Sequence, residues 1–270
     1  PGVFTGSNTS YLFDLRWRPT DHLSTYLRAA SAYRPGGPQI NGLAVLAGAP
    51  TSFGRDTTWD YEAGAKGQWL DRRLNANAAV YYIDWRNIQL NTEFGPFTLV
   101  GNGGNAKSEG VEFDGSYEPL HGLVFGANAS YDQAVITSAN LTNTAGARAG
   151  DPLPFTPKWS GALTGDYSFP IAPSMTGGIG ASWTYTGWRY SSLSADPLNT
   201  RERLPSYSLL ALRGHVHWNR YTLALSVNNV ANKQTYSSIS FLRLMPGQPV
   251  PGIALPVVPR TLRLNLTANF

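Results

Sequence analysis

The sequence contains no cysteine and few charged residues. Without cysteine, the chain can form neither a disulfide bond nor a thiolate metal site. Charged residues make up only 14% of the chain, against roughly 25% in ordinary soluble domains. No apolar run approaches the roughly 18 uninterrupted residues of a transmembrane helix. A helical membrane protein is therefore excluded, but a membrane β-barrel is not, because alternation hides the hydrophobicity of its strands.

Basic clusters are also missing from the chain. The formal net charge is only +4, and no run is rich in lysine or arginine. Composition therefore gives no indication of nucleic-acid binding. Aromatic residues, in contrast, are plentiful, with 8 Trp, 14 Tyr and 11 Phe. Few charges together with many aromatic side chains make an unusual surface for a freely soluble protein.

Apolar and polar residues alternate with a period of two along most of the chain. In segment 260–270, Leu262 and Leu264 fall on one face, whereas Arg263 and Asn265 fall on the other. This alternation is typical of a β-strand with one apolar and one polar face. Eleven segments show it: 9–18, 22–34, 57–69, 73–90, 105–118, 122–136, 157–168, 175–190, 206–217, 220–229 and 260–270.

The connections between these segments alternate in length. Short turns occur at 19–22, 70–73, 118–122, 170–174 and 217–220. Long loops rich in Gly, Pro, Ser and Asn occur at 35–56, 91–104, 137–155, 191–205 and 230–258. Outer-membrane barrels show this asymmetry, with short periplasmic turns and long extracellular loops. The sequence therefore predicts an all-β fold, an antiparallel transmembrane β-barrel.

The number of strands indicates that the barrel is larger than this chain. Barrels built from one bacterial chain have even strand numbers, whereas eleven is odd. The chain also opens at Pro1, with neither an initiator Met nor a targeting segment. We therefore expect about eleven strands of a presumed 22-stranded barrel. Within segment 73–90 the alternation blurs between Tyr81 and Trp85, which predicts a bulge or a change of environment.

Many aromatic residues fall towards strand ends on the apolar faces. They are Trp59, Trp69, Trp159, Trp183, Tyr117, Tyr131, Tyr167 and Tyr221. An interfacial aromatic girdle explains this placement, and a stacking platform for sugars is the alternative.

Five stretches carry a resemblance to one family. They are AYRPGG (32–37), TTWDYEAGAKGQWLDRRLNANAAVYYIDWRNIQ (57–89), NGGNAKSEGVEFDGSYEPLHGLVFGANASYDQA (102–134), LSVNNVANKQTY (225–236) and PRTLRLNLTANF (259–270). In this order they resemble segments of TonB-dependent outer-membrane receptors. The resemblance covers almost the whole chain and corresponds to the C-terminal half of the receptor barrel.

The resemblance implies a transport function rather than catalysis. Residues 1–270 would be the C-terminal part of the barrel, and the plug domain and TonB box of the family would lie upstream. A scarce ligand, most often a ferric siderophore, would bind the extracellular loops and enter the periplasm of a Gram-negative bacterium with TonB energy. The implied partners are outer-membrane lipid, TonB through the N-terminal region, and the barrel-assembly machinery, which would read Phe270 as an assembly signal. No cofactor is implied.

Ligand contacts are expected at the extracellular rim. Arginine suits the carboxylates or other anionic groups of a ferric chelate, and aromatic rings would accompany it. The candidate contacts are Tyr33, Arg34, Arg55, Arg148, Trp188, Arg189, Tyr190, Arg201 and Arg203.

Residues that could bind a metal or perform catalysis have simpler explanations. His215 and His217 share one strand face, but no third ligand lies nearby in the sequence. The carboxylates around Glu62 and Glu112 are spaced by two, so they share a polar face. They are better explained as lumenal charges that contact the plug, water or neighbouring strands than as the acid pair of a glycosidase. We predict neither a catalytic site nor a metal site.

Two other protein classes compete with the receptor interpretation. A passive porin or an autotransporter-like barrel would have the same alternation without a plug. A secreted, soluble β-rich protein that binds or hydrolyses carbohydrate would be a sandwich or a propeller. The soluble alternative leaves the strict alternation of long loops and short turns unexplained.

Overall fold

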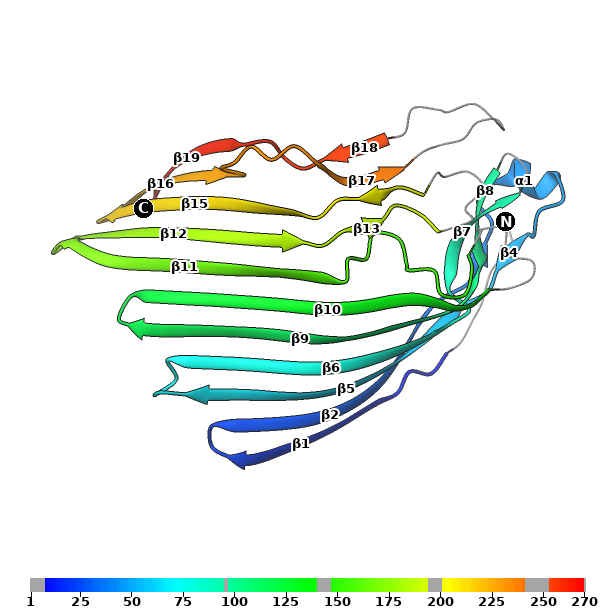
Figure 1. Ribbon diagram of the computed structural model, residues 1–270, viewed down its shortest axis with the longest axis horizontal. Helices are drawn as coiled ribbons and strands as arrows, with labels where there is room; N and C mark the ends of the chain where they lie inside the picture. The colour runs from blue at the N-terminus through cyan, green and yellow to red at the C-terminus, as the bar shows by residue number, and fades with distance from the viewer. Residues whose placement is uncertain (1–7, 95–96, 140–146, 194–200, 241–252, 270) are drawn as a thin grey trace.

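Eleven long antiparallel strands form one sheet whose order follows the chain (Figure 1). The computed structural model describes residues 8–94, 97–139, 147–193, 201–240 and 253–269. The sheet strands are β1 (Leu12–Thr20), β2 (Leu23–Arg34), β5 (Asp56–Trp69), β6 (Leu74–Arg86), β9 (Gly104–Leu120), β10 (Leu123–Ala139), β11 (Trp159–Ala172), β12 (Met175–Thr186), β15 (Tyr207–Trp218), β16 (Tyr221–Asn228) and β19 (Thr261–Ala268). This confirms the all-β antiparallel fold and the eleven strands. No helix in the described part of the chain is long and apolar enough to cross a membrane.

Tight turns join the strands at one end of the sheet, and long loops join them at the other (Figure 1). The turn between β9 and β10 is tight because a glycine occupies it. Gly122 has a φ of +81°, and a Cβ there would lie 2.3 Å from the carbonyl oxygen of Ser168. Only glycine meets both demands, because it adopts positive φ freely and lacks the Cβ.

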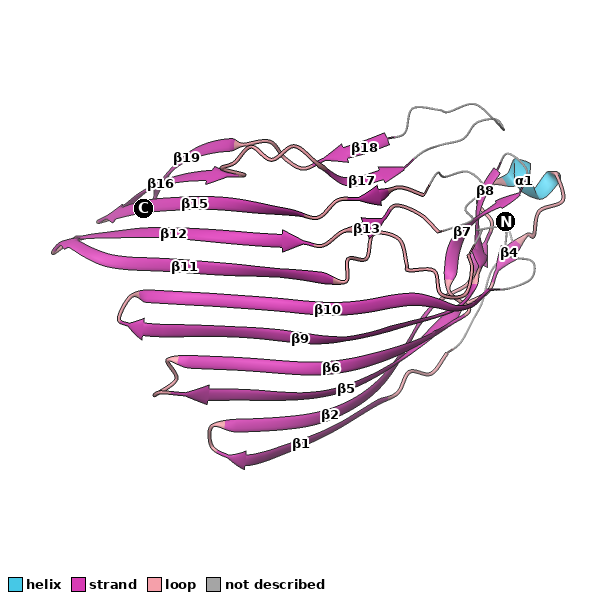
Figure 2. Cartoon of the chain, viewed as in Figure 1, coloured by secondary structure: helices cyan, strands magenta, loops and turns pink. Residues whose placement is uncertain are grey.

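The long loops contain short elements that the sequence analysis did not predict (Figure 2). They are β3 (Gly37–Pro38), α1 (Gly42–Leu46), β4 (Ser52–Phe53), β7 (Gln89–Phe94), β8 (Phe97–Asn102), β13 (Arg189–Tyr190), β14 (Arg203–Leu204), β17 (Tyr236–Ser240) and β18 (Ile253–Pro256). The strands pair as four small hairpins, apart from the main sheet. Most are too short for alternation to reveal them, so composition indicated only loops.

Each strand of the sheet carries one apolar and one polar face, as the alternation predicted. On β19, Leu262 and Leu264 are 68% and 69% exposed, and Leu264 pairs with Leu225 of β16. The polar side of the same ladder pairs Arg263 with Ser226. Exposed apolar surface on this scale is unfavourable in water, so the apolar face suits the hydrocarbon of a membrane.

The irregularity expected between Tyr81 and Trp85 is not a bulge. The pairing of β6 with β5 and with β9 runs without a register shift. Instead, the environment of the polar face changes there. Trp85 packs against the buried residues Ile88, Ala106 and Ile136 rather than facing an open polar surface. The loop beyond β6 therefore folds over the polar face at this end.

The buried apolar residues gather at the loop end of the sheet. One cluster contains Ile88, Ala106, Ile136, Ala147 and Leu193. A second contains Ala44, Ala49 and Leu99, with Phe94 and Phe97 packed against it. The wall is a single layer, so most of its large apolar side chains are exposed on the apolar face. The stability of a single-layer wall depends on lipid at its apolar face and on the contents of the barrel lumen at its polar face.

Aromatic rings gather near both ends of the apolar face. Towards the loop end, the rings of Tyr11 and Trp59 stack at 6.1 Å, and those of Tyr131 and Trp159 lie 4.9 Å apart. At the turn end, Trp218 of β15 is 53% exposed. Amphipathic rings prefer the two interfaces of a bilayer, so this arrangement matches the girdle predicted from the sequence.

Candidate functional site

Four of the predicted ligand residues form one cluster on the hairpin of β13 and β14. Tyr190 pairs directly with Arg203 in this hairpin. The ring of Trp188 meets that of Tyr190 edge-on, with centroids 5.4 Å apart. The guanidinium of Arg203 lies 4.4 Å from the ring centre of Trp188, and that of Arg201 lies 3.6 Å from that of Tyr190. We call Trp188, Tyr190, Arg201 and Arg203 the rim cluster.

The guanidinium of Arg201 is paired with a carboxylate and is only partly exposed. It lies 3.7 Å from the carboxylate of Asp151, which is itself only 7% exposed and accepts a hydrogen bond from the backbone N–H of Arg148. The Nε atom of Arg201 is buried, and no described residue accepts a hydrogen bond from it. A buried donor without an acceptor is costly, so this arrangement leaves Nε unsatisfied among the described residues.

Arg189 points away from the rim cluster and has a structural role. Its side chain is only 5% exposed and lies over the ring of Tyr207 at 5.5 Å. It donates hydrogen bonds to the backbone carbonyls of Tyr236 and Ser237. Because these acceptors belong to β17, Arg189 fastens the β13–β14 hairpin to the β17–β18 hairpin.

Arg34 belongs to a second cluster, centred on a carboxylate that the sequence analysis missed. Asp56 is 2% exposed and lies opposite Arg34 across the β2–β5 ladder. The carboxylate accepts hydrogen bonds from the guanidinium of Arg34, from Trp85 Nε1 at 3.0 Å and from the backbone N–H of Gln89 at 3.2 Å. The guanidinium also lies 5.0 Å from the ring centre of Trp85. We call Arg34, Asp56, Trp85 and Gln89 the Asp56 cluster.

The Asp56 cluster favours the charged form of its carboxylate. Burial by itself would raise the pKa of Asp56. The hydrogen bonds from Arg34, Gln89 and Trp85 outweigh burial and hold that pKa below its usual value. Asp56 lies beyond Trp59 at the loop end of β5, outside the segment that crosses the membrane.

The remaining predicted residues lie apart from the two clusters. Tyr33 lies within β2, next to Arg34 but on the opposite face of the strand, and is 40% exposed. Arg55 donates a hydrogen bond to the side chain of Asn8 at 3.0 Å. The side chain of Arg148 is exposed. Phe270, the predicted assembly signal, lies outside the described residues.

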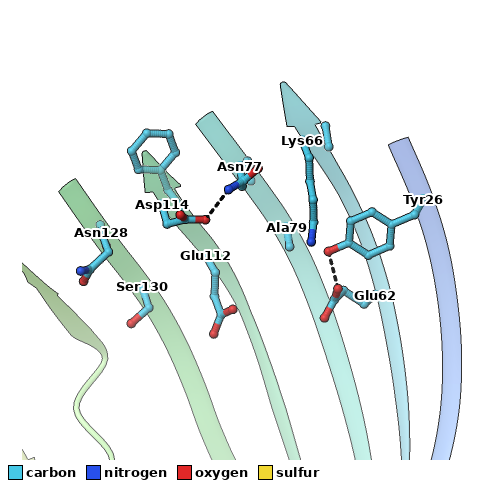
Figure 3. A pocket seen from close by; sticks show the side chains of 13 residues that line it. Tyr26, Glu62, Lys66, Asn77, Ala79, Glu112, Asp114, Asn128 and Ser130 are labelled. Atoms are coloured by element: carbon cyan, nitrogen blue, oxygen red, sulfur yellow. Dashed lines mark hydrogen bonds between the residues drawn. The ribbon is translucent and has the colours of Figure 1, made fainter. Parts of the chain in front are cut away.

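A polar hollow of about 370 Å³ lies on the polar face of the wall (Figure 3). Glu62, Glu112 and Asp114 line it together with one ammonium group, that of Lys66. Two of these carboxylates accept hydrogen bonds from other side chains of the wall. Tyr26 donates a hydrogen bond to Glu62, and Asn77 donates one to Asp114 at 2.8 Å. The excess of carboxylates makes the hollow suited to a positively charged partner.

The structure shows no metal-binding cluster within the part it describes. No group of three His, Cys, Asp or Glu side chains there could hold a metal ion. His217 interacts with Thr222 across the β15–β16 ladder, with its Nδ1 3.0 Å from the hydroxyl oxygen. Stacked arginines such as those at the loop end can bind anionic oxygens through charge-assisted hydrogen bonds.

A family model described as "TonB dependent receptor-like, beta-barrel" matches residues 2–230. The chain belongs to this family. Receptors of this kind lie in the outer membrane of Gram-negative bacteria, which places the apolar face in that membrane. The long loops of the TonB-dependent receptor wall are then extracellular, and its tight turns are periplasmic. The secreted soluble protein considered from the sequence is excluded.

Known proteins resemble this receptor barrel chain in sequence. The metal-pseudopaline receptor CntO of Pseudomonas aeruginosa is 26% identical over 257 residues, covering 94% of this chain and 32% of its own length. The probable TonB-dependent siderophore receptor PiuA of Acinetobacter baumannii is 23% identical over 249 residues, covering 87% and 32% respectively. The chain thus spans about a third of the length of these relatives.

Solved receptor structures share the fold. The ferric yersiniabactin uptake receptor FyuA from Yersinia pestis superposes with a TM-score of 0.74 at 19% identity, covering 96% of this chain and 37% of that chain. The siderophore receptor PiuA gives a TM-score of 0.70 at 20% identity, covering 96% and 35% respectively. In both cases this sheet matches part of a larger receptor.

Proposed function

We propose that this chain forms part of the barrel wall, together with ligand-binding loops, of a receptor that imports a small metal chelate across the outer membrane. The chelate class we propose first is a ferric siderophore. The ligand binds at the loop end, and TonB, acting through a region outside this chain, supplies the energy for release into the periplasm. The names of the relatives support a chelate, since they are receptors for metal-pseudopaline, siderophores and ferric yersiniabactin.

The observation that carries the proposal is the rim cluster. Arg201 and Arg203 lie over the rings of Tyr190 and Trp188, which fixes two positive charges side by side on one hairpin. The buried Nε of Arg201 lacks an acceptor among the described residues. Anionic chelates present several oxygens close together, and pre-positioned guanidinium groups bind such oxygens with a small entropy cost.

The polar hollow on the polar face of the wall is consistent with the same proposal. We propose that the plug domain of the full-length receptor packs on this face and places a basic side chain near Glu62 and Glu112. Charge complementarity supports this, because the hollow combines three carboxylates with one lysine. The apolar face contacts outer-membrane lipid, and the barrel-assembly machinery recognises the final strand and Phe270.

Uptake of radioactive iron tests the function. The full-length receptor is expressed in cells that lack their own siderophore receptors, which are offered ferric complexes of catecholate, hydroxamate and carboxylate chelators. Arg201→Gln should raise the chelate concentration for half-maximal uptake by about 10- to 100-fold, since a hydrogen bond to a charged group contributes about 1.5–3 kcal/mol. Arg220→Gln is the matched control, because Arg220 also lies over a tyrosine, Tyr221, but at the periplasmic end.

Two outcomes would contradict the proposal. One is no uptake of any chelate by the unaltered receptor, and the other is equal effects of the Arg201 and Arg220 substitutions. A strain without TonB separates active import from a passive pore. Import should stop in that strain while chelate binding to the cell surface persists, whereas a porin would continue to admit the chelate.

A further inference from the structure

Two loop segments that are distant in sequence pack into one body at the extracellular end. Ala44 and Ala49, in and after helix α1, are buried against Leu99 of β8. Phe94 and Phe97, at the tip of the β7–β8 hairpin, pack against the same cluster. An isolated five-residue helix is unstable in water, so α1 depends on this contact for its structure.

Polar contacts join the same two segments. Gln39 donates a side-chain hydrogen bond to the backbone carbonyl of Val100. The side chain of Asn102 accepts a hydrogen bond from the N–H of Gly54 at 2.7 Å and donates one to the carbonyl of Gly54 at 3.0 Å. Each contact satisfies a backbone group of one segment with a side chain of the other. We call residues 36–55, 87–94 and 97–103 together the loop module.

The loop module meets the barrel wall at Asp56. The carboxylate binds Arg34 at the end of β2, Trp85 near the end of β6 and the backbone of Gln89 at the start of β7. Gln89 then extends the connection, because its side chain donates hydrogen bonds to the carbonyls of Pro35 and Gly54, both at 3.0 Å. Those two carbonyls lie at the two ends of the first long loop. One buried carboxylate therefore connects three wall strands with both segments of the module.

We propose that the loop module moves as one rigid body and that Asp56 is the positioning residue that fixes its orientation on the wall. The proposal rests on the proposed receptor function, in which the extracellular loops form the ligand side. The module carries the exposed aliphatic side chains Ile40, Leu43 and Leu46. Asp56 thereby sets where this apolar surface stands relative to an incoming ligand.

A carboxylate is required at this position because its surroundings supply only donors. Arg34 contributes its backbone N–H and its guanidinium, and Trp85 and Gln89 contribute one N–H each. An asparagine has nearly the same shape, but its NH₂ group would face donors and leave some of them unpaired. Unpaired donors around this buried position would destabilise the junction rather than the wall.

Hydrogen exchange in the full-length receptor, reconstituted in lipid, tests the inference without any ligand. Asp56→Asn should raise exchange by about tenfold or more in residues 37–55 together with 89–94 and 97–102, since the loss of a charged hydrogen bond makes local opening of both segments easier. The strands β9 to β12 should be unchanged. Trp85→Phe is a milder variant that removes a single donor to Asp56 and should raise exchange in the same two segments by a smaller factor.

Asp166→Asn is the matched control. Asp166 also forms an ion pair with an arginine, Arg213, but this pair lies across β12 on the wall, away from the loop module. The control should leave exchange in both loop segments unchanged. The inference is overturned if only one segment responds to Asp56→Asn, if neither does, or if exchange rises equally throughout the wall strands.

Iron uptake supplies a second readout that a general loss of stability would not reproduce. For any ferric chelate that the unaltered receptor imports, Asp56→Asn should raise the concentration for half-maximal uptake about tenfold, with little change in the maximal rate per folded receptor. A fall in the maximal rate alone would count against a positioning role. If the unaltered receptor imports no chelate, the proposed function fails, whereas the exchange results still decide whether Asp56 fixes the module.

Discussion

The ring of Tyr26 on β2 covers the backbone of Gly64, its direct partner on β5. A Cβ at position 64 would lie 2.5 Å from the ring and its hydroxyl oxygen. Glycine therefore makes room for the ring, which reaches over it and donates a hydrogen bond to Glu62. Covering a strand glycine with an aromatic ring also replaces the packing that the missing side chain cannot supply.

Gly64→Ala should displace the Tyr26 ring and break its hydrogen bond to Glu62. We expect the free energy of unfolding to fall by about 1–3 kcal/mol, as for other insertions into well-packed sites. Urea titration of the full-length receptor in lipid measures the change. Gly214→Ala in β15 is the control, because a Cβ there would meet only a carbonyl oxygen at 3.7 Å, an ordinary contact. Equal stability of the two variants would refute the steric explanation.

Substitutions on the two faces of β19 should differ sharply. Leu264→Arg places a charge on the apolar face at bilayer depth and should cost about 2–4 kcal/mol, lowering the folded fraction in lipid. Asn265→Arg places the same charge on the polar face, next to Ala224, and should be tolerated. The folded fraction is read from the electrophoretic mobility of unheated samples. Equal tolerance of both variants would mean that the assigned faces are wrong.

Acid should release the loop module from the wall. The pKa of Asp56 is lowered in the folded protein, so its contribution to stability is fully present above the unfolded value of about 3.9 and is lost as pH falls through the lower folded value. Arg34 is the charged group that faces Asp56. Pepsin should therefore cleave residues 37–55 only at the acidic end of its range.

The same protease supplies the control for the acid experiment. In Asp56→Asn the position no longer titrates, so cleavage of residues 37–55 should be fast and independent of pH apart from the protease's own profile. If the unaltered receptor and the variant show the same pH dependence of cleavage, another group controls the release of the loop.

The sheet could be predicted from the sequence because its two faces have different solvents. A period of two specifies both the strand and the direction of each side chain, as Leu264 and Asn265 show. The turn and loop ends could be predicted from connection lengths alone. The hairpins within the loops could not, because elements such as β13 and β14 are two residues long and have no period.

The packing of the loop-end residues could be predicted only in part for a related reason. Residue type pointed to arginines and aromatic residues in the loops, and the structure stacks Arg201 on Tyr190. Residue type could not distinguish Arg189, which faces backbone carbonyls in the interior. Asp56 was missed because it falls at the end of the predicted long loop 35–56. Its partner could have been found from the register of the strands that flank the first long loop, which sets Arg34 opposite Asp56.

The order of the sheet has a consequence for how the wall is made. Each long strand pairs only with its neighbours along the chain, from β1 through to β19. No strand has to be inserted between two that already pair, so the wall can grow one hairpin at a time from either side. Contacts of short sequence separation close with a small entropy cost and form early. Assembly can therefore proceed by stepwise addition, in which each new hairpin pairs with the exposed edge strand of the hairpins already formed.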